Sequence, residues 1–520
     1  MNGSADLCFE KGDQLKMKKY LLGLDNGGSD IKCAIFDLDG NEISSSALQV
    51  AISTPHPGFT ERDADDVWKA NAEVIRTAIE KAGIDGKEIA AIGITAYGNG
   101  LVFTDEKMET VYPVIVSTDD RASDLVREFK ENGTERRLFP KTRQTLWSAQ
   151  PAVLLPWFKA NDEEVLKKTR WILSIKDYLR YRLTGEVFGE ITEASSTSLF
   201  DQDGQDYDIE LFRILGIEEC FEKMPPILHS TAIAGYISKE AGMQTGLAEG
   251  TPVAAGYFDI DANALASGIL SDDELCLIAG TWSINEFLTR DAARDHEKRT
   301  NTATTSYVEG LFLMEDSTPT SASNFNWYIE KIIREYAPGL KNEEIYGMCN
   351  RLVEGRDPNE SHVIFVPYLY ASASDPDAGA AFMNMSAKDD SASLLRAIYE
   401  GVVFSSVHHV HNLQRPVSSY RIAKLSGGIT NSEVWSQMMA DALQIPIQTL
   451  EGSQIGAKGA AIGAAIACGA FRDLKEGVSR MVHEGRIYMP RQEYARIYQK
   501  KYERYEAALE AVDLLAERCR

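Results

Sequence analysis

Apolar and polar positions along the start of the chain predict short strands. Tyr20–Asp25 and Ile31–Asp37 are apolar enough to be buried strands, with the tight NGGS loop between them. The Asp39-Gly40 pair in DLDGNEI is typical of a type I′ turn, so we expect an antiparallel meander. Beyond it, helices and strands alternate: Asp65–Ala82 is predicted to be helical, and EIAAIGITAYG to be a buried strand that ends in a glycine-containing loop.

A comparable pattern returns later in the chain. Helices dominate from Thr142 to Leu183, and PVAAGYFD, ELCLIAGTWS and GLFLMEDS have the character of strands. Helices are predicted at Leu394–Val410 and Ser432–Leu443. A strand that ends in a glycine-rich turn therefore occurs near residue 26 and again near residue 280. Two similar α/β halves would explain this repetition, although a strand followed by a glycine turn is common in any α/β protein.

The run GAKGAAIGAAIACGAF, which starts at Gly456, consists mainly of glycine and alanine and contains Lys458. No stretch of the chain has the roughly 18 consecutive apolar residues of a membrane span. Side chains this small suit a helix that packs closely inside a globular protein. With 520 residues, the chain is too long for one hydrophobic core, so two large domains or more are expected.

Charge and cysteine content narrow the classes of partner. The 78 acidic residues outnumber the 54 basic ones, which argues against nucleic acid or an anionic membrane surface as the main partner. Such a protein can still bind ATP through local dipoles and a metal. Seven cysteines without a CxxC pair or a secretory signal indicate reduced thiols in a cytoplasmic enzyme. Residues 1–17 lack periodicity, and we expect them to be a disordered extension.

Two halves of GLDNGGSDIKCAIFDLDG point to different chemistry. FDLDG resembles the nucleophile loop of a dehalogenase-type phosphatase, but Asn41 departs from that pattern and Asp39-Gly40 is better used as a turn. In GLDNGGS, consecutive glycines let backbone N–H groups approach an anion, and Asp25 could orient Mg²⁺ through water. A glycine turn with a capping aspartate is the equally simple alternative. A Walker A sequence and a well-placed GxGxxG are both absent, which argues against a P-loop site.

Later stretches supply further candidates. Gly280 and Thr281 follow an apolar strand in IAGTWSINEF, and LSGGITNSEVW leads through Gly428 to Ser432, which suits the N-cap of a helix near a nucleoside. Asp259 ends the apolar strand of AAGYFDIDANALASG, with Asp261 as the more natural N-cap. The HHVH segment, residues 408–411, offers no third metal ligand, so we treat it as part of an amphipathic helix.

Together these stretches resemble the FGGY carbohydrate kinases from Tyr20 to about Leu509, and within them the L-xylulose kinase/3-keto-L-gulonate kinase branch. The matching segments, in order, are GLDNGGSDIK, ITAYGNG, STDDRASD, QTLWSAQPAVLLPWF, LTGEVFGEITEASSTSLFD, GYFDIDANALASG, AGTWS, FVPYLYASASDPDAGAAF, IYEGVVFS and SGGITNSEVWSQMMADALQIPI. The resemblance implies an α/β protein with two RNase H-like (actin-like ATPase) domains hinged around a central cleft. Residues 18–260 would form the N-terminal domain and residues 261–520 the C-terminal domain.

The resemblance also implies roles for single residues. Asp259 matches the catalytic base, and Asp25 matches the carboxylate that holds Mg²⁺ through water. The remaining matches concern ATP: the first phosphate loop would be Gly27, Gly28, Ser29 and Lys32, the second Gly280 and Thr281, and the nucleoside site Asn326, Gly428, Asn431 and Ser432.

For the sugar, the resemblance points to Tyr97, Asn99 and Gln150 together with Asp259. Asn99 and Gln150 are neutral amides suited to hydroxyl groups, but the branch tends to have Gln-Gly-Lys in place of Tyr97-Gly98-Asn99 and His in place of Gln150. These departures leave the sugar open.

The function implied is an ATP- and Mg²⁺-dependent kinase acting on a terminal hydroxyl of a ketose, with L-xylulose or 3-keto-L-gulonate as the first choice. D-xylulose, L-ribulose, erythrulose and glycerol are alternatives, and an actin- or Hsp70-like ATPase that acts as a binding module is the alternative of another class. The oligomeric state is open, with a homodimer among the options.

Overall fold

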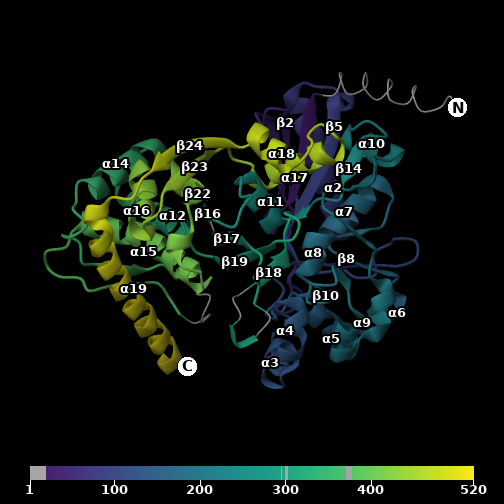
Figure 1. Ribbon diagram of the computed structural model, residues 1–520, viewed down its shortest axis with the longest axis horizontal. Coiled ribbons are helices and arrows are strands. Elements are labelled where there is room, and N and C mark those ends of the chain that lie inside the picture. Colours follow the sequence, from purple (N-terminus) through teal and green to yellow (C-terminus); the bar gives the residue numbers. More distant parts are fainter. Residues whose placement is uncertain are drawn as a thin grey trace. The chain divides into compact units, whose positions relative to one another are not determined.

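A computed structural model describes residues 19–280, 282–293, 296–298, 302–370, 378–413 and 415–519 (Figure 1). The extension predicted for residues 1–17 lies outside these ranges. The chain divides into two compact units. Unit 1 contains the residues up to Leu270 together with Thr289–Leu313 and Gly452–His483, and unit 2 contains Ser271–Leu288, Met314–Glu451 and the residues from Glu484 onward. Unit 1 therefore includes two segments that come late in the sequence.

Unit 1 is built on a sheet whose strands follow the order β13-β14-β5-β1-β2-β3, with β15 also paired to β5. The predicted meander is confirmed, because β1 pairs antiparallel with β2 and β2 with β3. On its other side β1 pairs in parallel with β5, which in turn pairs in parallel with β14 and β15. The strands are β1 (Tyr20–Asn26), β2 (Asp30–Asp37), β3 (Glu42–Gln49), β5 (Ile89–Ala96), β13 (Ile233–Tyr236), β14 (Pro252–Ala254) and β15 (Tyr257–Phe258).

The turn between β2 and β3 is not the predicted type I′ turn. That type requires positive φ at both central residues, whereas in this loop only Gly40, with φ 80°, has it. The Gly40 N–H donates to the Asp37 carbonyl at 3.1 Å, as in a three-residue hairpin loop with glycine in the left-handed position. The Asp37 carboxylate accepts the backbone N–H groups of Asp39 and Asn41, which holds this loop. The Asp37 side chain of FDLDG thus shapes the hairpin, while the Asp39 carboxylate accepts a hydrogen bond from Arg480 at 2.6 Å.

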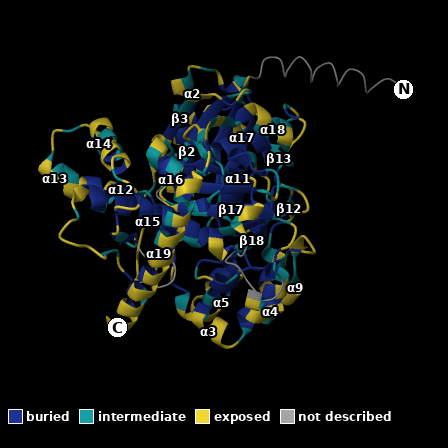
Figure 2. Ribbon diagram, turned by 60° about the vertical axis from the view of Figure 1, so that its left-hand side comes forward, coloured by how far each residue is buried: buried dark blue, intermediate teal, exposed yellow. Residues whose placement is uncertain are grey.

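Helix α17 (Ile455–Ala467) packs directly on the strands of unit 1 although it lies more than 350 residues further along the chain (Figure 1). An added Cβ at Gly23 of β1 would lie 1.8 Å from the Ala457 carbonyl oxygen, and one at Gly93 of β5 would lie 1.9 Å from the Ala460 carbonyl oxygen. The contact is therefore backbone to backbone, and α17 is mostly buried (Figure 2). This confirms the close packing that we predicted for the glycine- and alanine-rich run.

Unit 2 repeats the central pattern of unit 1. Strand β16 pairs antiparallel with β17 and in parallel with β22, which pairs in parallel with β23. The order β17-β16-β22-β23 corresponds to β2-β1-β5-β14, which confirms two similar α/β halves. The strands are β16 (Glu274–Ala279), β17 (Ser283–Thr289), β19 (Phe312–Thr318), β22 (Ile422–Ser426), β23 (Ile447–Glu451) and β24 (His483–Tyr488).

The predicted helices are present. Helix α2 (Ala64–Ala82) is capped by Asp63, which accepts N–H groups of its first turn, and by left-handed Gly83. Helices α15 (Ser391–Asn412) and α16 (Glu433–Leu443) match the two expected in the second half, and α19 (Gln492–Cys519) ends the described chain. The region from Thr142 to Leu183 contains α5 (Pro151–Asn161), α6 (Glu163–Lys168), β8 (Trp171–Leu173) and α7 (Ile175–Thr184).

Other elements complete the two units. They are β4 (Glu61–Arg62), β6 (Val102–Thr104), β7 (Val114–Ile115), α3 (Ser123–Glu131), α4 (Thr134–Thr142), β9 (Gly189–Glu190), α8 (Ile191–Ser195), β10 (Phe200–Asp201), β11 (Asp206–Tyr207), α9 (Ile209–Leu215), β12 (Ile227–Leu228), α10 (Lys239–Thr245), α11 (Asp259–Ala266), β18 (Thr302–Thr305), α12 (Ser323–Tyr328), α13 (Arg334–Tyr336), α14 (Asn342–Glu354), β20 (Ile364–Val366), β21 (Ala381–Met383) and α18 (Leu474–Met481). In the described part of the chain, no helix combines the length and the apolar character needed to cross a membrane.

Candidate active site

Three predicted site segments of unit 1 follow the ends of parallel strands. Asn26 at the end of β1 lies beside Ala96 at the end of β5, and Phe258 at the end of β15 lies on the other side of Ala96. Parallel strands end at the same edge of a sheet, and ligands of α/β proteins bind at that edge. The Gly27-Gly28 turn, the loop that starts at Tyr97, and Asp259 are therefore brought together, although more than 230 residues separate the first from the last.

The turn predicted to hold phosphate is closed by one backbone hydrogen bond, from the Gly27 N–H to the Asp30 carbonyl oxygen at 3.0 Å. An added Cβ at Gly28 would meet no atom within 4 Å, so the outer side of the turn is open. Ser29 is exposed and Lys32 half-buried. The turn thus leaves room for an anion next to its backbone.

Asp25 is a partly exposed carboxylate with a raised pKa. Burial raises the pKa to about 6, while the charge of Lys32, its partner across β1 and β2, acts in the opposite direction. An added Cβ at Gly456 would lie 2.7 Å from Asp25 Oδ2 and 3.4 Å from Asn263 Oδ1, so Asp25 lies against the first turn of α17. A cation stabilises a carboxylate whose charge is partly desolvated, and oxygen donors are those that Mg²⁺ prefers.

Asp259 is the first residue of α11, directly after Phe258. Its Oδ1 accepts the Ile260 N–H at 2.9 Å, and the side chain is partly exposed. The expectation that Asp261 caps this helix is wrong: Asp261 is the third residue of α11, completely buried, and accepts the Tyr307 N–H at 3.1 Å. The chain enters the helix straight from β15, so the N-cap position falls on Phe258, which has no side-chain acceptor.

The loop of Tyr97 and Asn99 is fixed from both sides. The Tyr97 N–H donates to the Asn26 carbonyl at 3.1 Å, and an added Cβ at Gly98 would lie 2.1 Å from the ring of Phe258, the residue before Asp259. Asn99 has a left-handed backbone with φ 64°. Its Oδ1 is buried and has no hydrogen-bond partner among the described residues. An unpaired buried amide oxygen is a natural acceptor for a ligand hydroxyl or a water.

Glu193 of α8 supports this loop, a role that the sequence alone did not suggest. Its Oε1 accepts the Asn99 N–H at 3.0 Å, and its Oε2 is buried without a partner among the described residues. Burial raises the pKa of Glu193 to about 8, against the opposing charge of Lys176. Glu193 lies in a quoted family segment, TEASS, but nothing in that pattern distinguishes it from the buried Glu190, which pairs with Lys176 at 2.5 Å.

Gln150 directly precedes α5 and is fully buried. Its Nε2 donates to the Ser196 carbonyl at 3.1 Å, and its Oε1 accepts from the Trp147 N–H and the Ser198 hydroxyl, both at 3.3 Å. The preceding carbonyl, that of Ala149, accepts the Gly100 N–H at 2.9 Å. The structure therefore ties Gln150 into the loop next to Asn99, and a direct contact with sugar stays a prediction.

In unit 2 the second pair of glycine turns also follows parallel strands. Ile278 of β16 lies beside Ser426 of β22, so Gly280 and the Gly427-Gly428 turn occur at one sheet edge. An added Cβ at Gly428 would meet nothing within 4 Å. Gly428 and Asn431 are exposed, and they are the first and last residues of a short 3₁₀ helix. Thr281 lies outside the described residues.

Ser432 is confirmed as the N-cap of α16. Its Oγ accepts the Trp435 N–H at 3.2 Å and donates to Asn350 Oδ1 at 2.8 Å. Asn326 is exposed on the short helix α12. These positions leave Asn326, Gly428 and Asn431 accessible, whereas the Ser432 hydroxyl already has partners.

Two other features lie apart from these residues. Groups of three or more potential metal ligands are absent from the described residues, which include His408 and His411.

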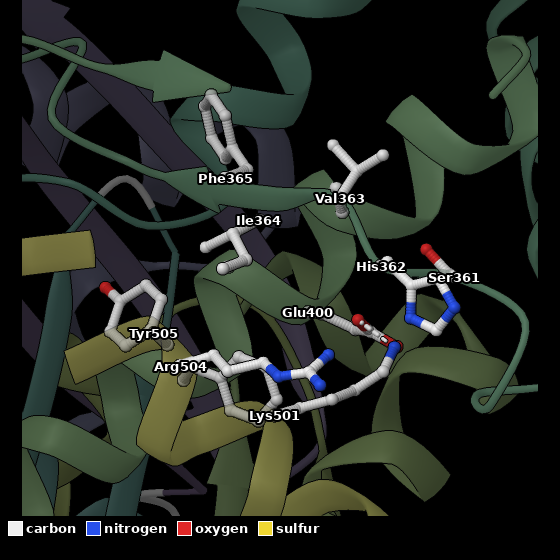
Figure 3. A pocket seen from close by; sticks show the side chains of 12 residues that line it. Ser361, His362, Val363, Ile364, Phe365, Glu400, Lys501, Arg504 and Tyr505 are labelled. Carbon is white, nitrogen blue, oxygen red and sulfur yellow. Dashed lines mark hydrogen bonds and ion pairs between the residues drawn. The ribbon is translucent and has the colours of Figure 1, made fainter. Parts of the chain in front are cut away.

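A pocket of unit 2 is lined by residues of β20, α15 and α19 and surrounds the Glu400 carboxylate (Figure 3). This carboxylate accepts hydrogen bonds from Lys501 at 2.6 Å and from Arg396 at 2.8 Å. None of the predicted site residues lines it, and the Lys501–Glu400 ion pair connects α19 to α15.

Comparisons with known proteins give a consistent result. Residues 20–266 match the N-terminal domain, and residues 275–468 the C-terminal domain, of the "FGGY family of carbohydrate kinases". The chain is 35% identical over 94% of its length to a "Probable L-xylulose kinase" of Pasteurella multocida, covering 98% of that protein. It is 33% identical over 95% of its length to an "L-xylulose/3-keto-L-gulonate kinase" of Escherichia coli, covering 98% of that protein.

Among solved structures, a ligand-bound xylulose kinase from Lactobacillus acidophilus superposes with a TM-score of 0.86 at 23% identity, over 96% of this chain and 100% of that one. At this identity the likeness concerns the fold.

Proposed function

Because the chain belongs to the FGGY family of carbohydrate kinases, we propose that it transfers the γ-phosphoryl group of ATP to a terminal hydroxyl of L-xylulose or 3-keto-L-gulonate. Relatives that carry these two sugars in their names are 33–35% identical to the chain. D-xylulose, L-ribulose, erythrulose and glycerol are the alternatives. The proposed enzyme is cytoplasmic, and a homodimer is one option for its assembly.

One observation carries the proposal: Asp259 lies at the same sheet edge as the open Gly27-Gly28 turn and the Tyr97 loop. A kinase needs a carboxylate base, a phosphate-binding turn and a sugar-binding loop within reach of one another. The three parallel strand ends of unit 1 bring together the residues proposed for these parts from distant stretches of the chain, which supports the proposal.

In the proposed reaction, Asp259 accepts the proton of the sugar hydroxyl while that oxygen forms a bond to the γ-phosphorus and the bond to the β,γ-bridging oxygen of ATP breaks. The products are a sugar phosphate and ADP. The base needs only to be ionised at neutral pH, which an ordinary aspartate is. Phosphoryl transfer depends mainly on positioning and on charge neutralisation, which the turn backbone provides at Gly27, Gly28 and Ser29 with the Lys32 charge.

Asp25 is the residue proposed to hold Mg²⁺ through water, and the ion would neutralise charge on the transferred phosphate. Asn99, Tyr97 and Gln150 are proposed to bind the sugar, with the unpaired Asn99 Oδ1 as the acceptor for a hydroxyl group. Gly280 and Thr281 are proposed to contact phosphate, and Asn326, Gly428, Asn431 and Ser432 the nucleoside. Residues 18–260 and 261–520 remain the proposed domains.

The test compares the wild type with Asp259→Asn in an assay that couples ADP release to a visible signal, with and without each candidate sugar. The wild type should consume ATP only when a ketose is present, and Asp259→Asn should lose turnover by at least about a thousandfold while still binding ATP. Asp37→Asn is the matched control, because Asp37 shapes the β2–β3 hairpin, and it should keep normal turnover. Normal turnover by Asp259→Asn would refute the assignment of the base.

A further inference from the structure

We infer that Arg62 is a positioning residue that orients the Gly27-Gly28 turn for binding the β- and γ-phosphates of a nucleotide. The inference rests on the proposed function, since it assigns the turn to phosphate. Arg62 belongs to none of the segments that sequence reasoning selected, and its role follows from three observations in unit 1.

The first observation concerns how Arg62 reaches the turn. It is one of two residues in β4, which pairs with β7. Neighbouring residues of a strand point to opposite faces. Glu61 accepts hydrogen bonds from Arg121 at 2.7 Å and from the Tyr112 hydroxyl at 2.8 Å, and this network anchors the strand. The Arg62 side chain extends to the other side, toward the turn.

The second observation is the contact itself. Arg62 Nη2 donates to the Gly28 carbonyl at 2.5 Å, and Nη1 approaches the Gly27 carbonyl at 3.4 Å. In a planar trans peptide the C=O and the following N–H point in opposite directions. Two carbonyls held toward Arg62 therefore direct the N–H groups of Gly28 and Ser29 away from it. Two successive N–H groups with a common orientation are a concave site for an anion.

The third observation is that the guanidinium is buried and incompletely paired. Arg62 is 1% exposed, its Nε is buried without a hydrogen-bond partner, and it forms no ion pair with any described residue. A buried charge is costly unless an opposite charge offsets it. A bound phosphate next to the turn would supply that opposite charge, so the positive potential of Arg62 favours polyphosphate over the nucleoside part of a nucleotide.

Arg62 also lies close enough to the sugar loop to affect it. Its charge opposes the rise that burial causes in the pKa of Tyr97, whose hydroxyl is buried without a partner among the described residues. The same guanidinium thus acts both on the turn, through hydrogen bonds, and on Tyr97, through its charge. We expect its main effect on nucleotide binding because, within the described ranges, the guanidinium is hydrogen-bonded to the turn alone.

The experiment measures the affinities of ATP, ADP and AMP for Arg62→Ala and Arg62→Lys by calorimetry. Arg62→Ala should bind ATP and ADP at least about tenfold more weakly and AMP within about twofold of the wild type. Millimolar methylguanidinium should restore part of the ATP affinity. Arg62→Lys keeps the charge but loses the bidentate donor, and its affinity should fall about threefold to tenfold for ATP alone. If Arg62→Ala does not fold, the ATP-to-AMP affinity ratio of Arg62→Lys decides the question.

Arg396→Ala is the matched control. Arg396 is a buried arginine of unit 2 that likewise donates to two backbone carbonyls, those of Val353 and Arg356. Its loss should lower stability but leave the ATP-to-AMP affinity ratio unchanged. Equal weakening of ATP and AMP in the Arg62 variants, or no weakening, would overturn the inference. Failure of the wild type to phosphorylate any sugar would instead refute the proposed function, which this binding ratio does not test.

Discussion

Asp25 and Lys32 lie directly opposite each other in the antiparallel pair formed by β1 and β2. The carboxylate nevertheless has a raised pKa of about 6, because burial outweighs the attraction of the lysine. A buried carboxylate whose charged form lowers the stability of the fold is typical of functional sites, because such sites retain groups that activity needs even where they destabilise the protein.

Asp25→Asn should therefore stabilise the protein while it impairs the enzyme. The ordinary pKa is 3.8 and the folded value about 6, so folding disfavours the charged form above pH 6, and this penalty disappears as the pH falls through 6 toward 4. The variant should gain about 1–2 kcal/mol at neutral pH, less than the roughly 3 kcal/mol of the full shift because the carboxylate is partly exposed. Urea unfolding without Mg²⁺ at several pH values checks this.

The gain of Asp25→Asn should vanish near pH 4, and turnover with MgATP should fall by about 100-fold or more. A second variant, Lys32→Met, separates the effect of the lysine charge from that of burial. It removes the charge that lowers the pKa of Asp25 and should move the titration of Asp25 to higher pH. Equal stability of Asp25→Asn and the wild type at every pH would contradict the raised pKa.

Glu193→Gln should be tolerated, and its advantage in stability over the wild type should grow as the pH rises from about 4.5 to 8. Glu193 has an ordinary pKa of 4.5 and a folded value of about 8, so it is mostly protonated at neutral pH, and the neutral amide resembles that form. The wild type should lose stability relative to Glu193→Gln as the pH rises from about 4.5 to 8, because the unfolded carboxyl group ionises in this range while the folded one keeps its proton. Above pH 8 the difference should stay constant, and toward pH 4.5 it should close. Thermal unfolding across this range measures it, and Glu193→Ala, which also removes the acceptor of the Asn99 N–H, should be less stable than Glu193→Gln by about 1–3 kcal/mol at every pH.

Gly456→Ala and Gly93→Ala should separate an effect on the site from an effect on the fold. The new Cβ of Gly456→Ala would press on the Asp25 carboxylate, a side chain that can shift, so turnover should fall about tenfold or more with a small loss of stability. At Gly93 the nearest atoms are the backbone of Ala460, which cannot shift alone, so Gly93→Ala should lose several kcal/mol. Kinetics and urea unfolding of both variants measure this, and unchanged turnover of Gly456→Ala would contradict its contact with Asp25.

Local pattern was enough to predict much of the fold. The apolar character of Tyr20–Asp25 and Ile31–Asp37 predicted β1 and β2, and the polar cap before Trp435 predicted the start of α16, because both depend on neighbouring residues. The turn at Gly40 and the cap of α11 were predicted wrongly. In both cases residues outside the predicted motif decided the conformation. At Gly40 the Asp37 side chain holds the turn, and at α11 the chain enters the helix directly from β15.

The supporting residues could not be found from local pattern. Arg62 and Glu193 act on loops 35 and 94 residues away, and only the strand pairing of the folded chain brings them there. The glycine and alanine content of the run from Gly456 did indicate close packing, but not that the helix joins unit 1 or lies beside Asp25. The residues proposed to bind ligands came from family resemblance, and the structure adds which of them share a sheet edge.

The most direct test of the central claim is the ADP-release assay with a panel of L-xylulose, 3-keto-L-gulonate, D-xylulose, L-ribulose, erythrulose and glycerol, performed on the wild type and Asp259→Asn in parallel. The account predicts that the wild type consumes ATP with L-xylulose or 3-keto-L-gulonate at a kcat/KM at least about tenfold above any other sugar, and that Asp259→Asn loses this activity. ATP hydrolysis by the wild type that is independent of every sugar would contradict it.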